Sequence, residues 1–232
     1  MIPLKDDLPT DRMPIVTFAL VATNVLVFLW QLQVGLDISV QRGGAIPYEI
    51  LTFRDVEWRD LVPPPFTIFT SMFLHGGWLH LGFNMLTLWI FGNNVEDALG
   101  RLRFLVFYVI SGVAAALAQT LASAASGDVL VPMVGASGAI AGVLAAYLVL
   151  FPWARVLTAV IIVIFVRLVY LPARFFILGW FALQVLSVLF GSTPGGGIAF
   201  FAHIGGFLAG LLLVKIIGRR PPWRARRMWD PR

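Results

Sequence analysis

Seven apolar windows divide the chain, and polar stretches separate them. The windows cover residues 14–33, 78–95, 102–124, 137–151, 156–171, 175–190 and 199–217. A helix needs about 20 apolar residues to cross a hydrocarbon core of about 30 Å. The first three windows fit this length, whereas window 156–171 is short and contains Arg167. The pattern predicts a bundle of membrane helices. Length alone does not decide whether window 156–171 crosses the membrane.

Composition agrees with a membrane protein. The chain is 59% hydrophobic and 12% charged, with a mean hydropathy of +0.88, whereas soluble domains carry about 25% charged residues. The absence of Cys excludes disulfides, thiolate catalysis and cysteine metal sites. The net charge of +5 comes from basic residues at the ends of apolar runs, which favours a role in topology over binding of nucleic acid.

Charge placement determines the topology that we expect. If window 156–171 crossed the membrane, the last helix would invert and the basic stretch 219–227 would lie outside. If the window instead lies along, or dips into, the inner face, six spans remain and both termini are cytoplasmic. All but three of the 17 Lys and Arg residues are then inside, the exceptions being Arg42, Arg54 and Arg59. The positive-inside rule favours this second arrangement.

We therefore predict an all-α, polytopic membrane protein built as a six-helix bundle with a long first outer loop, residues 35–77. Residues 1–13 form a cytoplasmic segment, residues 14–218 the membrane domain and residues 219–232 a basic cytoplasmic tail. We expect that tail to bind anionic lipid headgroups rather than a protein partner.

Polar residues interrupt three of the spans at similar depths. At about 1.5 Å per helical residue, the heights above the inner surface are about 21 Å for Ser137, about 23 Å for His203, about 24 Å for His80 and about 18 Å for Asn84. Polar groups at such depth are costly and by default indicate function. Their common layer predicts that these four residues meet.

Each of these residues also has a structural interpretation. Ser137 lies in Gly135-Ala136-Ser137-Gly138, which taken alone indicates helix packing with the hydroxyl bonded to its own helix. His203 could be a neutral histidine satisfied between helices, and His80 and Asn84 a structural pair one helical turn apart. The shared layer favours the functional interpretation over these alternatives.

Small residues predict which helices touch. Gly138 with Gly142, and Gly206 with Gly210, have the spacing that lets two membrane helices approach backbone to backbone. The helices that carry Ser137 and His203 are therefore expected to be in direct contact. His75 is expected to be structural or interfacial, because three histidines without cysteine or an HExxH motif argue against a zinc hydrolase.

The chemistry that fits these residues is acyl transfer. A neutral histidine is the usual base for a serine nucleophile. Residues 129–217 contain no Asp or Glu, which predicts a Ser137/His203 dyad unless an acid folds in from the long outer loop. The side chains of His80 and Asn84 and the Ser137 backbone N–H are suitable oxyanion donors. The loops at 126–128 and 191–197 imply a cavity open to the outside, which would admit water.

Three ordered motifs resemble those of the rhomboid intramembrane serine proteases. They are His75-Gly76-Gly77-Trp78-Leu79-His80-Leu81-Gly82-Phe83-Asn84, Gly135-Ala136-Ser137-Gly138 and Ala202-His203-Ile204-Gly205-Gly206-Phe207-Leu208-Ala209-Gly210. Weaker similarity covers Leu178-Gly179-Trp180 with Gln184, and residues 91–97.

The resemblance implies that Ser137 is the nucleophile, His203 the general base, and His80 and Asn84 the oxyanion-hole side chains. It also implies a membrane-helix substrate that enters past the fifth span and is cut near its outer end, without a cofactor. A catalytically silent relative that binds or retains membrane helices is the alternative. A small transporter would more typically show internal repeats and paired charges at mid-depth, which the sequence lacks.

The sequence departs from the family pattern at two places. Family members often carry Tyr or Phe four residues after the nucleophile, against the catalytic histidine, but this chain has Ala141. Another group must therefore hold His203. The Trp58-Arg59 pair lies further upstream of the second span than is usual, so an anchoring role for it is not expected.

Overall fold

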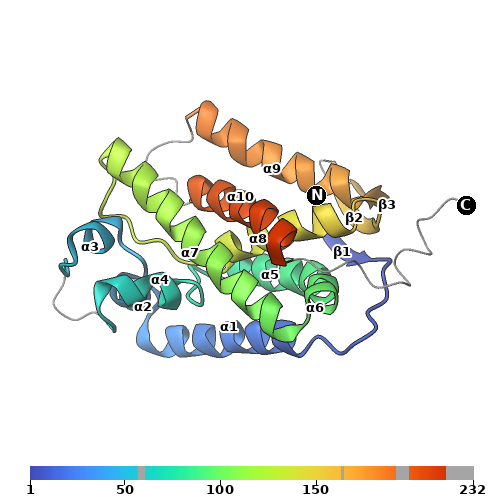
Figure 1. The fold of residues 1–232 in the computed structure, drawn as a ribbon. Coiled ribbons are helices and arrows are strands. Elements are labelled where there is room, and N and C mark those ends of the chain that lie inside the picture. The colour runs from blue at the N-terminus through green and yellow to red at the C-terminus, as the bar shows by residue number, and fades with distance from the viewer. Residues whose placement is uncertain (57–60, 163–164, 192–198, 218–232) are drawn as a thin grey trace, which may run out of the picture.

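Apolar helices make up most of the computed structural model, which describes residues 1–56, 61–162, 165–191 and 199–217 (Figure 1). Within these residues, three helices are long and apolar enough to cross a membrane: α1 (Ile15–Val34), α7 (Arg101–Ser126) and α10 (Phe200–Ile217). Two shorter apolar helices are α8 (Ser137–Leu150) and α9 (Ala173–Leu189). Each lies in a window where the sequence predicts a spanning helix.

The second predicted span is one helical stretch with a change of pitch. It consists of α5 (Trp78–Thr87), the π-helical segment η2 (Leu88–Gly92) and α6 (Asn93–Leu99). The π segment keeps the backbone helical while it widens one turn. In the part of the chain that the structure describes, six apolar helical segments thus occupy the windows expected to span. The number that cross a bilayer stays a prediction.

Window 156–171 is a β-hairpin, so the prediction of an all-α chain is wrong here. Strand β2 (Arg155–Ile162) pairs antiparallel with β3 (Phe165–Pro172), from Arg155 opposite Pro172 to Ile162 opposite Phe165. Strand β1 (Ile2–Asp6) pairs antiparallel with the other edge of β2, which gives the order β1-β2-β3. The hairpin is rich in Val and Ile, whose β-branched side chains suit strands. Its place at the inner membrane face stays a prediction.

The first strand ties the N-terminal segment to the helices (Figure 1). Asp6 Oδ2 accepts hydrogen bonds from Tyr147 Oη at 2.6 Å and from Asn94 Nδ2 at 2.7 Å. Burial raises the pKa of Asp6 to about 6, an effect that the bond from Tyr147 opposes. Asp7 forms an ion pair of 3.0 Å with Arg155. Residues 2–7 are therefore part of the folded structure.

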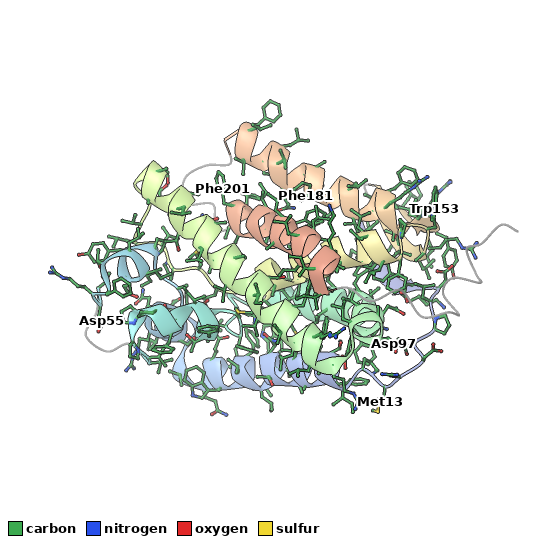
Figure 2. All side chains as sticks on the ribbon, viewed as in Figure 1. Met13, Asp55, Asp97, Trp153, Phe181 and Phe201 are labelled. Atoms are coloured by element: carbon green, nitrogen blue, oxygen red, sulfur yellow. The ribbon has the colours of Figure 1, made fainter. Side chains whose placement is uncertain are left out.

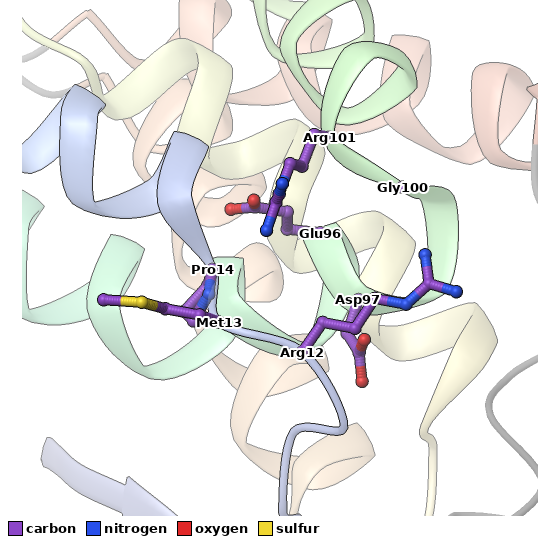
Figure 3. Close-up of a pocket in the computed structure, with 7 residues that line it drawn as sticks. All are labelled: Arg12, Met13, Pro14, Glu96, Asp97, Gly100 and Arg101. Atoms are coloured by element: carbon purple, nitrogen blue, oxygen red, sulfur yellow. The ribbon is translucent and has the colours of Figure 1, made fainter.

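A buried carboxylate caps the first long helix. Glu96, 2% exposed, accepts bonds from the N–H groups of Val16 and Thr17 and from Thr17 Oγ1, at 2.7 to 3.0 Å. The positive end of the α1 dipole stabilises this charge. Glu96 also lines a pocket of about 220 Å³ between the starts of α1 and α7, with Arg12, Met13, Pro14, Asp97, Gly100 and Arg101 (Figure 3).

Close contact between α8 and α10 forms the centre of the bundle, as the small-residue spacing predicts. A Cβ atom at Gly210 would lie 2.5 Å from Cα and O of Gly142, and one at Gly206 would collide with the carbonyl oxygen of Gly138. Helix α7 packs against both helices. On the other side of α10, Phe181 of α9, labelled in Figure 2, stacks on Phe207 with ring centroids 4.2 Å apart.

Short helices occupy the long first loop: α2 (Leu36–Gly43), α3 (Pro47–Thr52), η1 (Pro64–Phe66) and α4 (Thr67–Ser71). Ala45 and Met133 exchange backbone hydrogen bonds, and the N–H of Tyr48 donates to the carbonyl of Val129. The loop thus packs on the segment that leads into α8. The Trp58-Arg59 pair, loop residues 192–197 and the tail 219–232 lie outside the described residues.

Candidate active site

The turn before α8 places Ser137 as the first residue of that helix. Gly135 has φ +121° and donates its N–H to the carbonyl of Ser71 at 2.8 Å. A Cβ at position 135 would lie 2.7 Å from His80 Nε2 and 3.6 Å from Ser137 Oγ. Only glycine combines this backbone angle with so close an approach. The turn therefore brings Ser137 beside His80.

Ser137 and His203 form a hydrogen-bonded pair. Ser137 Oγ lies 2.9 Å from His203 Nε2, although the residues are 66 positions apart. They come from α8 and α10, the two helices held together by the glycine contacts. Both side chains are half-buried. The distance is within the range expected for a nucleophile and its general base.

His203 is held on its other side by α9. Gln184 Oε1 lies 2.8 Å from His203 Nδ1, and Gln184 Nε2 donates to the carbonyl oxygen of Trp180 at 3.2 Å. The Trp180 ring lies 5.6 Å from the His203 ring, centroid to centroid. The aromatic contact missing at Ala141 is thus supplied from a different helix. The sequence showed Trp180 and Gln184 only as a weak family similarity, with no role attached.

His80 directs a ring N–H toward the turn beside Ser137. The Gly76 N–H donates to His80 Nδ1 at 3.3 Å. Because Nδ1 accepts this bond, the proton of the neutral ring is assigned to Nε2. That nitrogen is the atom nearest to position 135. Asn84, one turn further along α5, donates Nδ2 to the His80 carbonyl at 3.0 Å, which leaves its second amide hydrogen for another acceptor.

The start of α8 adds backbone donors. The first backbone bond of this helix runs from the Ile140 N–H to the Ala136 carbonyl. The N–H groups of Ser137, Gly138 and Ala139 therefore have no acceptor within the helix, as at any helix start. Together with the helix dipole, such groups favour negative charge at this end.

His75 stands apart from this constellation. Its ring is fully buried and lies 5.1 Å from the His80 ring. Its backbone exchanges two hydrogen bonds with the Gln31 side chain of α1, at 2.8 and 3.2 Å. These contacts join the first span to the loop that precedes α5, which agrees with a structural residue. Among the described residues, no group of three His, Cys, Asp or Glu side chains could hold a metal ion.

The four predicted residues therefore lie together. Ser137 and His203 are bonded directly, the Nε2 of His80 faces the turn beside Ser137, and Asn84 is bonded to the backbone of His80. The arrangement offers a hydroxyl with a base and nearby N–H donors, which are the parts that acyl transfer requires.

Comparison with known proteins identifies the family. A family model described as the Rhomboid domain matches residues 63–220, more than half of the chain. Rhomboid protein 1, mitochondrial, of Saccharomyces cerevisiae is 34% identical over 142 residues, which cover 60% of this chain and 38% of that protein.

Two further relatives are similar. RHOMBOID-like protein 1 of Arabidopsis thaliana is 29% identical over 192 residues, or 81% of this chain and 41% of the relative. Rhomboid protease GluP of Bacillus subtilis is 33% identical over 137 residues, or 58% of this chain and 24% of the relative. The matches thus span less than half of these three proteins. With the family model covering the site and most of the helices, the chain belongs to the rhomboid family.

Proposed function

We propose that this protein is an intramembrane serine endopeptidase that hydrolyses a peptide bond of membrane-helix substrates near their extracytoplasmic end. The observation that carries the proposal is the 2.9 Å contact between Ser137 Oγ and His203 Nε2, with N–H donors gathered beside it. A family member known as a protease, from Bacillus subtilis, is among the similar proteins.

In the first half of the reaction, Ser137 Oγ attacks the carbonyl carbon of the scissile bond while His203 Nε2 takes the hydroxyl proton. The C–N bond of the tetrahedral intermediate then breaks, and His203 returns the proton to the leaving amine. The product is an ester between Ser137 and the N-terminal part of the substrate. In the second half, water attacks the carbonyl carbon of this ester while His203 Nε2 takes a proton from the water. The bond between that carbon and Ser137 Oγ then breaks, His203 returns the proton to Oγ, and the N-terminal part of the substrate leaves as a carboxylic acid.

Negative charge develops on the carbonyl oxygen in both steps. We assign its stabilisation to the Nε2–H of His80, the free amide hydrogen of Asn84 and the backbone N–H of Ser137. Donors that are already in place need no reorganisation as the charge forms, and one such donor is typically worth about 2.7 to 4 kcal/mol of barrier.

The proposal includes a location. The protein is placed in the cell membrane as a multi-pass protein with cytoplasmic termini, and its active site opens to the extracytoplasmic side. Residues 1–13, 14–218 and 219–232 then form the N-terminal segment, the membrane domain and the basic tail. Its partners would be membrane proteins and the bilayer itself, with no nucleic acid and no cofactor.

Labelling with a biotinylated fluorophosphonate tests the reaction without knowledge of the substrate. We expect the purified protein in detergent to form an adduct that peptide mass spectrometry assigns to Ser137. The Ser137→Ala and His203→Ala variants should form none. Ser126→Ala is the matched control and should label normally, because Ser126 is the last residue of α7 and its hydroxyl donates to the Ser123 carbonyl.

Cleavage of a membrane-helix substrate completes the test. The wild-type protein should cut a substrate that carries a helix-destabilising segment near its outer end, and Ser137→Ala should not. A silent relative would bind this substrate without forming an adduct or a product. Undiminished cleavage by Ser137→Ala would show that Ser137 is not the nucleophile.

A further inference from the structure

Gln184 occupies the position that an acidic residue holds beside the histidine of many serine hydrolases. It is 8% exposed and lies on α9, with its Oε1 2.8 Å from His203 Nδ1. We propose that Gln184 is a positioning residue for His203, so that Ser137, His203 and Gln184 act together as a triad rather than a dyad. This inference rests on the proposed function.

The hydrogen bonds fix which atoms donate. The Gln184 amide nitrogen donates to the carbonyl oxygen of Trp180 at 3.2 Å, and a carbonyl can only accept. The amide oxygen of Gln184 is therefore the atom that faces His203. An oxygen facing Nδ1 must accept, so Nδ1 carries the proton of the neutral imidazole.

This assignment has a direct consequence for Ser137. With the proton on Nδ1, the lone pair of Nε2 faces Ser137 Oγ at 2.9 Å and can accept the hydroxyl proton. The opposite tautomer would present an N–H to the serine and could not act as its base. Gln184 thus selects the tautomer in which His203 can take a proton from Ser137, as the orienting acid does in a serine triad.

An amide suits this position because the surroundings are apolar. Residues 129–217 contain no Asp or Glu, and a buried carboxylate among membrane helices would have a high desolvation cost. A neutral acceptor orients the ring without that cost. A neutral amide also stabilises a protonated imidazole less than a carboxylate would. Replacing Gln184 by an acidic residue is therefore expected to change the pH profile of the reaction.

Helix α9 provides both supports of His203. Trp180 and Gln184 are one turn apart, so they share a face of α9, and both contact the same imidazole. A displacement of α9 away from α10 would remove the ring contact and the hydrogen bond together. The position of this one helix therefore controls the tautomer of the base.

The test compares substitutions at position 184 by the rate of fluorophosphonate labelling of Ser137 at pH 5 to 9. We expect Gln184→Leu, which removes the acceptor, to slow labelling by about tenfold to a hundredfold, part of the 10²–10⁴ that a positioned base contributes. Gln184→Glu restores an acceptor and adds a charge. It should label faster than Gln184→Leu, with the low-pH side of its profile moved to higher pH.

Leu183→Ala is the matched control, because Leu183 is the preceding residue of α9 and is 58% exposed. It should label like the wild type. Wild-type rate and profile in Gln184→Leu would overturn the proposal. If Gln184→Leu does not fold, Gln184→Met, which also removes the amide acceptor, takes its place, and the wild-type rate and profile in that variant would overturn the proposal.

Nitrogen NMR separates this inference from the proposed function. The chain has three histidines, so ¹⁵N-histidine labelling with His203→Ala as the assignment reference isolates the signals of His203. We expect an Nδ1-protonated ring in the wild type and a mixture of tautomers in Gln184→Leu. An unchanged tautomer would contradict the role of Gln184 even if Ser137 labels. A wild-type protein that never labels would instead contradict the proposed function.

Discussion

A comparison of two asparagines, Asn84 and Asn24, can test whether Asn84 stabilises the oxyanion. Asn84 and Asn24 are both buried on predicted spans, and each donates its amide to the backbone carbonyl four residues earlier. Only Asn84 follows His80 on the helix that borders Ser137. The two side chains are thus alike in burial and local bonding, but they lie on different helices, Asn24 on α1 and Asn84 on α5.

We expect Asn84→Ala to lower kcat for a membrane-helix substrate by about 10²–10³, the loss typical of one oxyanion donor. The melting temperature should move little, because the bond lost is local to α5. The Asn24→Ala variant should keep the wild-type kcat. Equal losses of kcat in both variants would mean that Asn84 acts through stability, not through the oxyanion.

The sequence predicts some of these residues better than others. Ser137, His203, His80 and Asn84 stand out because polar groups at one depth in three apolar stretches need a common explanation. Gln184 does not stand out, because a lone amide on an apolar helix has no chemical signature. Its role depends on the rotation of α9 about its own axis, which the spacing of α9 residues alone does not determine.

At the level of helices, the separation of α8 and α10 sets the distance between nucleophile and base. A Cβ at Gly210 would come within 2.5 Å of Gly142, and backbone atoms cannot move aside as a flexible side chain can. Gly210 is two turns from His203, so a methyl group there touches no reacting atom. It acts only by pushing the helices apart.

Gly210→Ala should therefore slow the labelling of Ser137 by at least about tenfold, because the hydrogen bond to His203 depends on that helix spacing. It should also lower the midpoint of thermal unfolding. Gly179→Ala is the control, since a Cβ at Gly179 meets nothing within 4 Å. A Gly210→Ala protein that labels and melts like Gly179→Ala would refute the close contact.

The helices are easier to predict from sequence than the sheet. Long apolar windows identify α1, α7, α8, α9 and α10 because a membrane helix must be continuously apolar. Window 156–171 is equally apolar, and periodicity does not separate a buried strand from a short helix. One of the two neighbours of β2 is β1, about 150 residues away in the sequence. Such a pairing leaves no local signal.

At the scale of the whole molecule, the structure has two ends, which we expect to face opposite sides of the membrane. Asp55 lies at one end, while Trp153 and Asp97 lie at the other (Figure 2). The sheet is at the second end (Figure 1), which we expect to face the cytoplasm because of the distribution of Lys and Arg. The turn that follows α7, before the segment bonded to the first loop, is at the first end (Figure 1).

Single cysteines can test this orientation because the chain has none of its own. We expect a membrane-impermeant maleimide to modify Asp128→Cys on intact cells or spheroplasts. Leu4→Cys, at a position 41% exposed on β1, should react only after the membrane is opened. The reverse pattern would mean that the protein is inserted the other way, with its active site facing the cytoplasm.

The hydrogen bonds between Glu96 and the start of α1 limit how far the chain can be shortened at its N-terminus. The family match begins at residue 63, yet Glu96 finds its donors at Val16 and Thr17, and β2 finds one of its neighbours in residues 2–6. A fragment trimmed to residues 63–220 would keep Ser137, His203 and Gln184. It would also leave a buried charge without donors and one strand edge unpaired. The region that the family model matches is therefore smaller than the unit that folds.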